Sequence, residues 1–292
     1  MKNHLIPVVI LLLLISSCKS NISKEQHLKQ ISEIENGLIP AVIIDGEETE
    51  TYNINDRMKY HKVPGMSIAF MDQGEIVWAK GYGYTSFDSI VAVDLNTLFQ
   101  AASISKPVAA MAALHLVEEG KLGLDDNVND YLVGWKVEEN KFPSEEKVTL
   151  RRLLSHSAGI TVHGFGGYSD TDSVPGIIEV LNGEAPANSG RIFPDTVPGS
   201  IYRYSGGGYT VMQKMLCDIS GKEFPVLMNE YVLSVIGMES STYIQPIPPE
   251  LESKAAIAYR ADGSMVKGKW HIYPEMAAAG LWTNPTDLLK YA

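Results

Sequence analysis

The sequence predicts an α+β fold, in which an antiparallel sheet is flanked by helices and a mostly helical region is inserted. Two observations support this expectation. Strand-like segments lie near both ends of the chain, and segments with helical character lie between them. The 292 residues, 45% of them hydrophobic, suffice for one large domain or two small ones.

The N-terminal part is expected to contain a broken helical region and then a strand pair. Its segments are residues 26–62, with breaks at 37–40 and 46, then strands 66–71 and 75–84 joined by a turn at 72–74. The next segment, Ser103 to Glu119, is rich in Ala, Leu, Met and Val, and Gly120 follows it. This composition predicts a buried helix and not a membrane span.

The remaining elements are expected in the order short helix, long loop, two helices and hairpin. They are residues 149–154, 161–201, 209–220, 224–236, and the pair 255–260 and 265–272. At the end of the chain, residues 283–287 have the Pro and the acidic residue of a helix start, with five residues after them. We expect the sequence to stop before the fold does.

The first residues predict export and not part of the fold. Lys2 precedes the apolar run Leu5 to Ile15, which is too short for a convincing membrane span. Ser16-Ser17-Cys18 resembles the bacterial lipobox, in which the cysteine becomes a lipidated N-terminus; a plain secretory signal is the alternative. We therefore expect a signal peptide (1–17), a tether (18–26) and one folded domain (27–292), lipid-anchored at Cys18 in the bacterial cell envelope and facing the periplasm or the surface.

The net charge and the cysteine and histidine content limit the binding partners, disulfides and cofactors that can be expected. The net charge of -11 argues against a nucleic-acid partner. If Cys18 carries lipid, Cys217 has no cysteine to pair with, and we expect a buried structural thiol there. The seven histidines show no metal-ligand spacing, so no cofactor is expected.

Ser103 and Lys106 form the first candidate catalytic pair. Residues three apart on a helix share one face, and a serine needs a neighbour to take its proton. A lysine does this when burial or a nearby positive charge lowers its pKa. The Ser-x-x-Lys pattern also starts at Ser16, Ser144 and Ser264, but only Ser103 opens a long apolar helix. A helix cap is the alternative role for Ser103.

Tyr204 adds a second signal. It stands before the run Gly206-Gly207-Gly208 and a helix, and a phenol can relay a proton when a cation lowers its pKa. The glycines would let the backbone approach a substrate closely. The alternative is a glycine-rich turn with an aromatic ring packed beneath it.

Together these motifs resemble the serine β-lactamase / penicillin-binding-protein superfamily, in which Ser-x-x-Lys is a marker. The likeness is to the branch of class C β-lactamases, D-alanyl-D-alanine carboxypeptidases and related esterases. Tyr204-Ser205-Gly206 matches the second motif, Tyr-x-Asn, at the tyrosine and departs from it at Gly206. The missing amide argues against β-lactam hydrolysis more than against hydrolysis in general.

Two further segments fit the same resemblance. Residues 153–160 are similar to the family's Leu-Leu-x-His-Thr-Ser-Gly-Ile, and residues 278–282 to its Gly-Gly-Leu segment. The resemblance implies a β-lactamase/transpeptidase-like fold, a catalytic Ser103, Lys106 and Tyr204, and substrate binding by Ser205, Gly206 and Gly280. His156 is expected to be structural, because the lysine and the tyrosine already handle protons.

The family's third motif, Lys-Thr-Gly or His-x-Gly, has no match in this sequence. We expect it on C-terminal strands beyond residue 292, where it would supply one oxyanion donor beside the Ser103 N–H. The resemblance implies an acyl-enzyme hydrolase of a β-lactam, a D-Ala-D-Ala peptide or another small or peptidoglycan-like ester or amide. The competing hypotheses are an inactive cell-wall or ligand-binding lipoprotein with the same fold, and a purely structural lipoprotein.

Overall fold

The computed structural model describes residues 24–144 and 146–292, which belong to two compact units. One unit is Met1–Tyr60 and the other His61–Ala292. The predicted signal peptide, Cys18 and most of the tether lie outside the described residues. Residues 24–26, expected in the tether, already belong to a helix. The predicted domain limits of 27–292 stay a prediction.

The described part of the first unit contains two helices with an irregular segment between them. They are α2 (Lys24–Asn36) and α3 (Ile54–Tyr60). Both occur in the region predicted to be helical, although α2 begins before residue 26, and the irregular residues include both predicted breaks. Leu38 and Tyr52 exchange backbone hydrogen bonds across that segment, which closes it into a loop.

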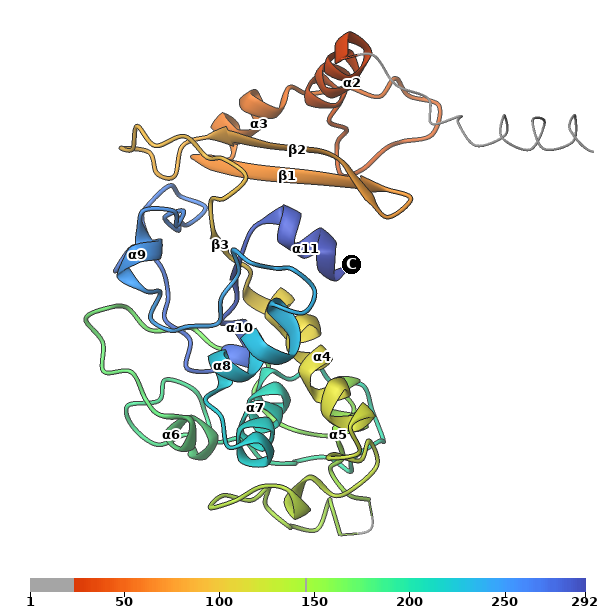
Figure 1. The fold of residues 1–292 in the computed structure, drawn as a ribbon, viewed down its shortest axis with the longest axis vertical. Helices are drawn as coiled ribbons and strands as arrows, with labels where there is room; N and C mark the ends of the chain where they lie inside the picture. The colour runs from red at the N-terminus through yellow and green to blue at the C-terminus, as the bar shows by residue number, and fades with distance from the viewer. Residues whose placement is uncertain (1–23, 145) are drawn as a thin grey trace, which may run out of the picture. The chain divides into compact units, whose positions relative to one another are not determined.

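The second unit begins with the predicted strand pair. β1 (Gly65–Asp72) and β2 (Glu75–Gly83) are antiparallel, with Gly65 opposite Gly83 and Asp72 opposite Glu75. Gln73 and Gly74 at the turn both have positive φ, 49° and 80°, which suits the right-handed twist of a two-residue hairpin. The pair packs against α11 (Pro285–Tyr291), so residues from both ends of this unit meet (Figure 1).

The predicted helices occur, with corrected limits. The unit contains η1 (Ala102–Ile104), α4 (Ser105–Glu118), η2 (Val128–Asp130), α5 (Leu150–Leu154), α6 (Ile177–Asn182), α7 (Gly206–Ser220), α8 (Phe224–Met228), the π-helical turn η3 (Asn229–Leu233), α9 (Pro249–Glu252) and α10 (Met276–Ala279). The glycine run belongs to the first turn of α7 and not to a loop before it. The single helix predicted over 224–236 changes to a π-helical turn after Met228.

The hairpin predicted over 255–272 is wrong in detail. Tyr259 and Met265 form an isolated bridge, the Ala258 carbonyl accepts from Val266 N–H, and the Ala258 N–H donates to the Lys269 carbonyl. The turn is present, but the residues on either side of it do not continue as two paired strands. Ile272 forms its backbone hydrogen bonds with Tyr168 instead. The second antiparallel pair of this unit is formed instead by β3 (Phe99–Gln100) and β4 (Trp282–Thr283).

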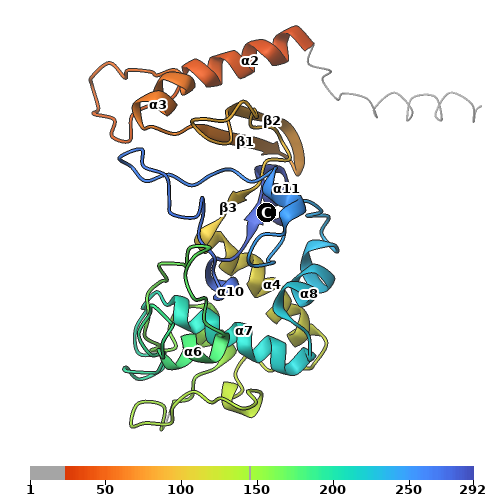
Figure 2. The same ribbon diagram turned by 90° about the vertical axis from the view of Figure 1, so that its left-hand side faces the viewer.

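The main core of the second unit lies around α4, α7 and α10, which pack on one another in both views (Figures 1 and 2). Ala109, Ala112 and Ala113 on α4 are fully buried, and their small side chains let the neighbouring helices approach closely. The predicted buried helix is therefore confirmed. None of the helices among residues 24–144 and 146–292 combines the length and apolar character needed to cross a membrane.

Candidate active site

The turn that opens α4 exposes Ser103 and buries Lys106. Ser103 lies on η1, and the lysine keeps 5% of its surface exposed. Lys106 Nζ donates hydrogen bonds to Ser103 Oγ at 3.0 Å and to the Ala278 carbonyl of α10 at 2.8 Å. The predicted pair is thus brought together, and a second element fixes the lysine from the opposite side.

The backbone before Ser103 has an uncommon conformation. Ala102 has φ of 44°, a left-handed value that costs a non-glycine residue roughly 1–3 kcal/mol. The segment is held on both sides, because Ala101 N–H donates to the Leu281 carbonyl at 2.9 Å and Leu281 N–H donates to Ser105 Oγ at 2.9 Å. These bonds keep the Ser103 side chain at the surface of the turn.

Ser105 is the matched contrast to Ser103. It is fully buried, its hydroxyl accepts from Leu281, and its carbonyl accepts from the Tyr243 hydroxyl at 2.6 Å. Both polar groups are used to join α4 to its neighbours. Of these two serines, Ser103 is therefore the one whose hydroxyl can reach a substrate.

Tyr204 lies beside the lysine. Lys106 Nζ is 4.9 Å from the centre of its ring. Burial raises the pKa of the Tyr204 phenol, but hydrogen bonding to Lys106 and Ser103 and the lysine charge outweigh it, so the pKa lies below its usual value. This is the cation effect expected of a proton-relaying phenol.

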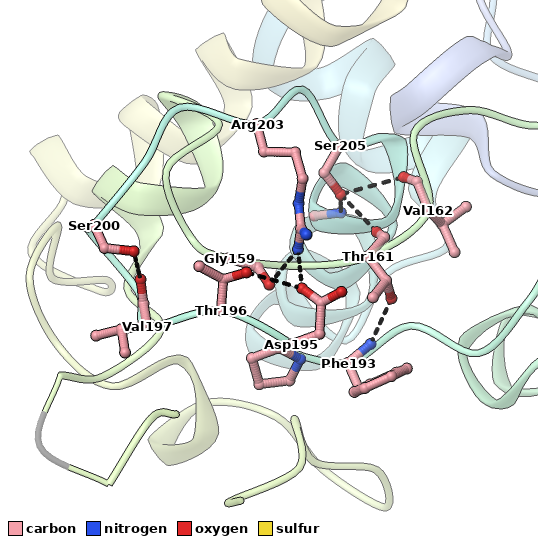
Figure 3. Close-up of polar contacts among 12 residues, drawn as sticks. Gly159, Thr161, Val162, Phe193, Asp195, Thr196, Val197, Ser200, Arg203 and Ser205 are labelled. Carbon is pink, nitrogen blue, oxygen red and sulfur yellow. Dashed lines mark hydrogen bonds and ion pairs between the residues drawn. The ribbon is translucent and has the colours of Figure 1, made fainter. Parts of the chain in front are cut away.

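Both chain neighbours of Tyr204 are anchored. The Arg203 guanidinium donates to the Gly159 carbonyl at 2.7 Å and forms an ion pair with Asp195 (Figure 3). Ser205 Oγ donates to the Thr161 carbonyl at 2.8 Å and accepts from Gly208 N–H, which caps the N-terminus of α7. The tyrosine is therefore held in place by the residues on either side of it.

Two histidine rings also contact the Tyr204 ring. The His156 centroid lies 4.3 Å away and that of His163 lies 5.0 Å away. His156 Nδ1 accepts from Ser205 N–H at 3.1 Å, which puts the ring proton on Nε2. Burial lowers the pKa of His156, and the charges of Lys106 and His163 lower it further. This geometry gives His156 a supporting contact to the tyrosine loop.

The three residues predicted to bind substrate are all buried. Ser205 caps α7, and the Gly280 carbonyl accepts from Gln245 Nε2 at 2.7 Å. A Cβ on Gly206 would lie 3.0 Å from the Phe165 ring and 3.2 Å from the His163 carbonyl, so the 163–165 loop fills that space. The structure gives all three packing or capping roles, and their contact with a substrate stays a prediction.

Sequence reasoning missed two parts of this site. The Ala278 carbonyl is a backbone group, which no residue pattern marks. The exposed His163 stands between an apolar segment and Gly164-Phe165-Gly166-Gly167, and that glycine-flanked histidine was the available signal.

Within the described chain, no three His, Cys, Asp or Glu side chains are grouped to hold a metal ion. Burial raises the pKa of the half-buried Cys217 thiol on α7 to about 12.

The arrangement is that of a β-lactamase/transpeptidase-like fold: a serine on the turn that opens a buried helix, a lysine in its first turn, a tyrosine before a second helix, and a short antiparallel pair joining distant segments. The sequence profile of the Beta-lactamase family matches residues 52–292. The chain belongs to that family, whose members are generally serine hydrolases.

Among curated relatives, Protein flp of Staphylococcus aureus strain MW2 is 27% identical over 246 residues, covering 83% of this chain and 47% of flp. The putative penicillin-binding protein PbpX of Bacillus subtilis strain 168 is 28% identical over 254 residues, covering 84% of this chain and 59% of PbpX. The chain thus spans about half the length of these relatives.

Solved structures show the same likeness. An octameric penicillin-binding protein homologue from Pyrococcus abyssi has a TM-score of 0.65 at 28% identity, covering 82% of this chain and 53% of that one. A class C β-lactamase mutant has a TM-score of 0.65 at 22% identity, covering 93% and 65%. The β-lactamase/D-alanine carboxypeptidase from Yersinia pestis has a TM-score of 0.64 at 19% identity, covering 80% and 63%.

Proposed function

We propose that the protein is a serine hydrolase that cleaves an ester or amide through an acyl-enzyme on Ser103. The observation that carries this proposal is the 3.0 Å contact between Lys106 Nζ and the exposed Ser103 Oγ, with the lysine held by the Ala278 carbonyl. Such a hydroxyl beside a fixed cation is preorganised for attack on a carbonyl carbon. Membership of the Beta-lactamase family supports the same conclusion.

The proposed chemistry has two steps. Because Lys106 lowers the pKa of Tyr204, its phenolate serves as the base: Ser103 Oγ attacks the substrate carbonyl carbon and gives its proton to the phenolate oxygen of Tyr204. The tetrahedral intermediate collapses, the leaving group takes the proton from Tyr204, and the acyl group stays on Ser103. A water then attacks the ester, with Tyr204 accepting its proton and returning it to Ser103.

The candidate substrates are a β-lactam, a D-Ala-D-Ala peptide and a small ester. The closed space beside Gly206 argues for testing simple esters and peptides as well as β-lactams, because the 163–165 loop occupies the position where a longer side chain would project. Turnover of a chromogenic cephalosporin, a D-Ala-D-Ala peptide and a p-nitrophenyl ester distinguishes the three. Binding of all three without turnover supports the inactive-lipoprotein alternative.

The nucleophile is tested with a fluorophosphonate probe. We expect the label on Ser103 by peptide mapping of the wild type, and no labelling of Ser103→Ala. Ser105→Ala is the matched control and should still be labelled, although it removes a buried hydrogen bond. A label mapped to Ser105, or an unlabelled wild type that unfolds cooperatively, contradicts the proposal.

We also propose that the mature protein is held in the cell envelope by lipid on Cys18. The support is the apolar run Leu5 to Ile15 followed by Ser16-Ser17-Cys18. Growth with labelled palmitate should mark the wild type, and Cys18→Ser should remove the label. Equal labelling of both proteins would contradict the anchor.

A further inference from the structure

A carboxyl group outside the Ser–Lys–Tyr cluster is buried without a partner. Glu275 is fully buried, and neither of its carboxyl oxygens has a hydrogen-bond partner among the described residues. It stands directly before α10, and its own carbonyl accepts from Ala278 and Ala279. Most buried polar groups in proteins are paired, so an unpaired carboxyl at this position calls for a physical explanation.

Several titratable or polar side chains lie near the Glu275 carboxyl and the helix α10 that follows it. Tyr273 lies two residues before it, and Tyr168 lies on another loop. Burial raises the pKa of both phenols, and the charge of Glu275 raises it further. Lys106 faces α10 from α4, and Ser103 lies on η1, which also packs on α10. From α7 comes Gln213, which is neutral.

α10 links Glu275 to the lysine. Gln213 Nε2 donates to the Pro274 carbonyl at 2.9 Å, and Gln213 Oε1 accepts from Ala277 N–H at 2.8 Å. The next residue, Ala278, supplies the carbonyl that accepts from Lys106. α10 has only four residues, about one turn, so a displacement at its N-terminal end also displaces its C-terminal end.

The ionised form of Glu275 does not suit this environment. A carboxylate without a partner and without solvent carries a large desolvation cost, whereas a neutral carboxylic acid carries much less. Burial raises the pKa of Glu275 to about 7, although its own backbone N–H lowers it somewhat. The neutral form is therefore the one that the seated helix accommodates.

We propose that Glu275 is a positioning residue whose protonated carboxyl keeps α10 seated, and whose ionisation loosens α10 and draws the Ala278 carbonyl away from Lys106. The consequence for Ser103 rests on the proposed function; the ionisation itself does not. The chemistry at Ser103 becomes sensitive to alkaline pH through a group that never contacts the substrate.

The direction of the effect on stability follows from proton linkage. The unfolded carboxyl has a pKa near 4.5 and the folded one near 7, so the folded state binds more protons between these values. The stability associated with Glu275 is fully present below about pH 4.5 and is lost as the pH rises to about 7. Above that pH, Glu275→Gln should melt at a higher temperature than the wild type.

The experiment compares wild type, Glu275→Gln and the exposed-site control Glu239→Gln from pH 5 to 9. Thermal unfolding and the rate of fluorophosphonate labelling are measured at each pH. We expect the wild-type labelling rate to fall about tenfold per pH unit above about 7 relative to Glu275→Gln, as for one ionisation. Glu239→Gln should follow the wild type in both measurements.

The outcomes separate the two proposals. A wild type that is unlabelled at every pH contradicts the proposed function, and the difference in unfolding still reports the ionisation. A labelled wild type whose pH profile and unfolding are unchanged by Glu275→Gln contradicts the positioning role. Glu275→Asp serves as the conservative variant and should keep a pH-dependent profile, which a merely space-filling role would not produce.

Discussion

Lys106 contacts the Tyr204 ring on one side and the Ala278 carbonyl on the other. We call residues 203–205 the tyrosine wall and residues 275–279 the α10 wall, and the two differ in how fully their polar groups are paired. At the tyrosine wall, Arg203 pairs with Asp195, and Ser205 both caps α7 and bonds to a loop carbonyl. At the α10 wall, Gln213 satisfies two backbone groups, but the buried Glu275 carboxyl has no partner among the described residues. Within the described chain, the tyrosine wall leaves only the Arg203 Nε without a partner, on a guanidinium that is otherwise bonded and always charged, whereas the α10 wall leaves both oxygens of an ionisable carboxyl unpaired.

This difference indicates which of the two walls can open locally when the pH changes. A network in which most polar groups are bonded resists local opening, because each broken bond leaves a further group without a partner. An unpaired buried carboxyl favours opening as soon as it ionises. We therefore expect the tyrosine wall to set the proton chemistry of the site and the α10 wall to set its dependence on pH.

The largest expected effect is on the chemistry of the tyrosine wall. Tyr204→Phe removes the phenol but keeps the ring that contacts His156 and His163. Turnover should fall roughly 10²–10⁴-fold, the usual contribution of general acid-base catalysis, with little change in melting temperature. Rate measurements on a substrate of the wild type test this, and an unchanged rate removes Tyr204 from the mechanism.

A smaller effect is expected from breaking the α10 wall. Gln213→Leu leaves the Pro274 carbonyl and the Ala277 N–H without their partner. Each buried unpaired group costs about 1–3 kcal/mol, so denaturant unfolding should show a clear loss of stability. Gln213→Glu is the control, since one oxygen can still accept from Ala277. Equal stability of wild type and Gln213→Leu would show that water replaces both bonds.

The smallest effect is expected at the cap of the tyrosine wall. Ser205→Ala removes the acceptor for Gly208 N–H and should cost about 0.5–2 kcal/mol, as for other helix caps. Ser205→Thr keeps the hydroxyl and should recover part of that loss. If Ser205→Ala costs more than Gln213→Leu, the ranking of the two walls is reversed.

Local patterns in the sequence predicted many of the elements. The β1–β2 hairpin, the buried helix after Ser103 and the Asn284 cap of α11 depend on residues close together in the chain. Where prediction failed, long-range bonds replaced local ones. Residues 255–272 have the composition of a hairpin, but Ile272 pairs with Tyr168, about a hundred positions earlier.

For the site, local patterns predicted that Ser103 and Lys106 share a face and that Tyr204 stands before a helix, since three-residue spacing and glycine content are local properties. The folded chain was needed to see that the Ala278 carbonyl holds the lysine, that the 163–165 loop fills the space at Gly206, and that the buried Glu275 carboxyl has no partner among the described residues. These depend on contacts between distant segments, and a backbone carbonyl or an unpaired carboxyl has no signature in a residue pattern.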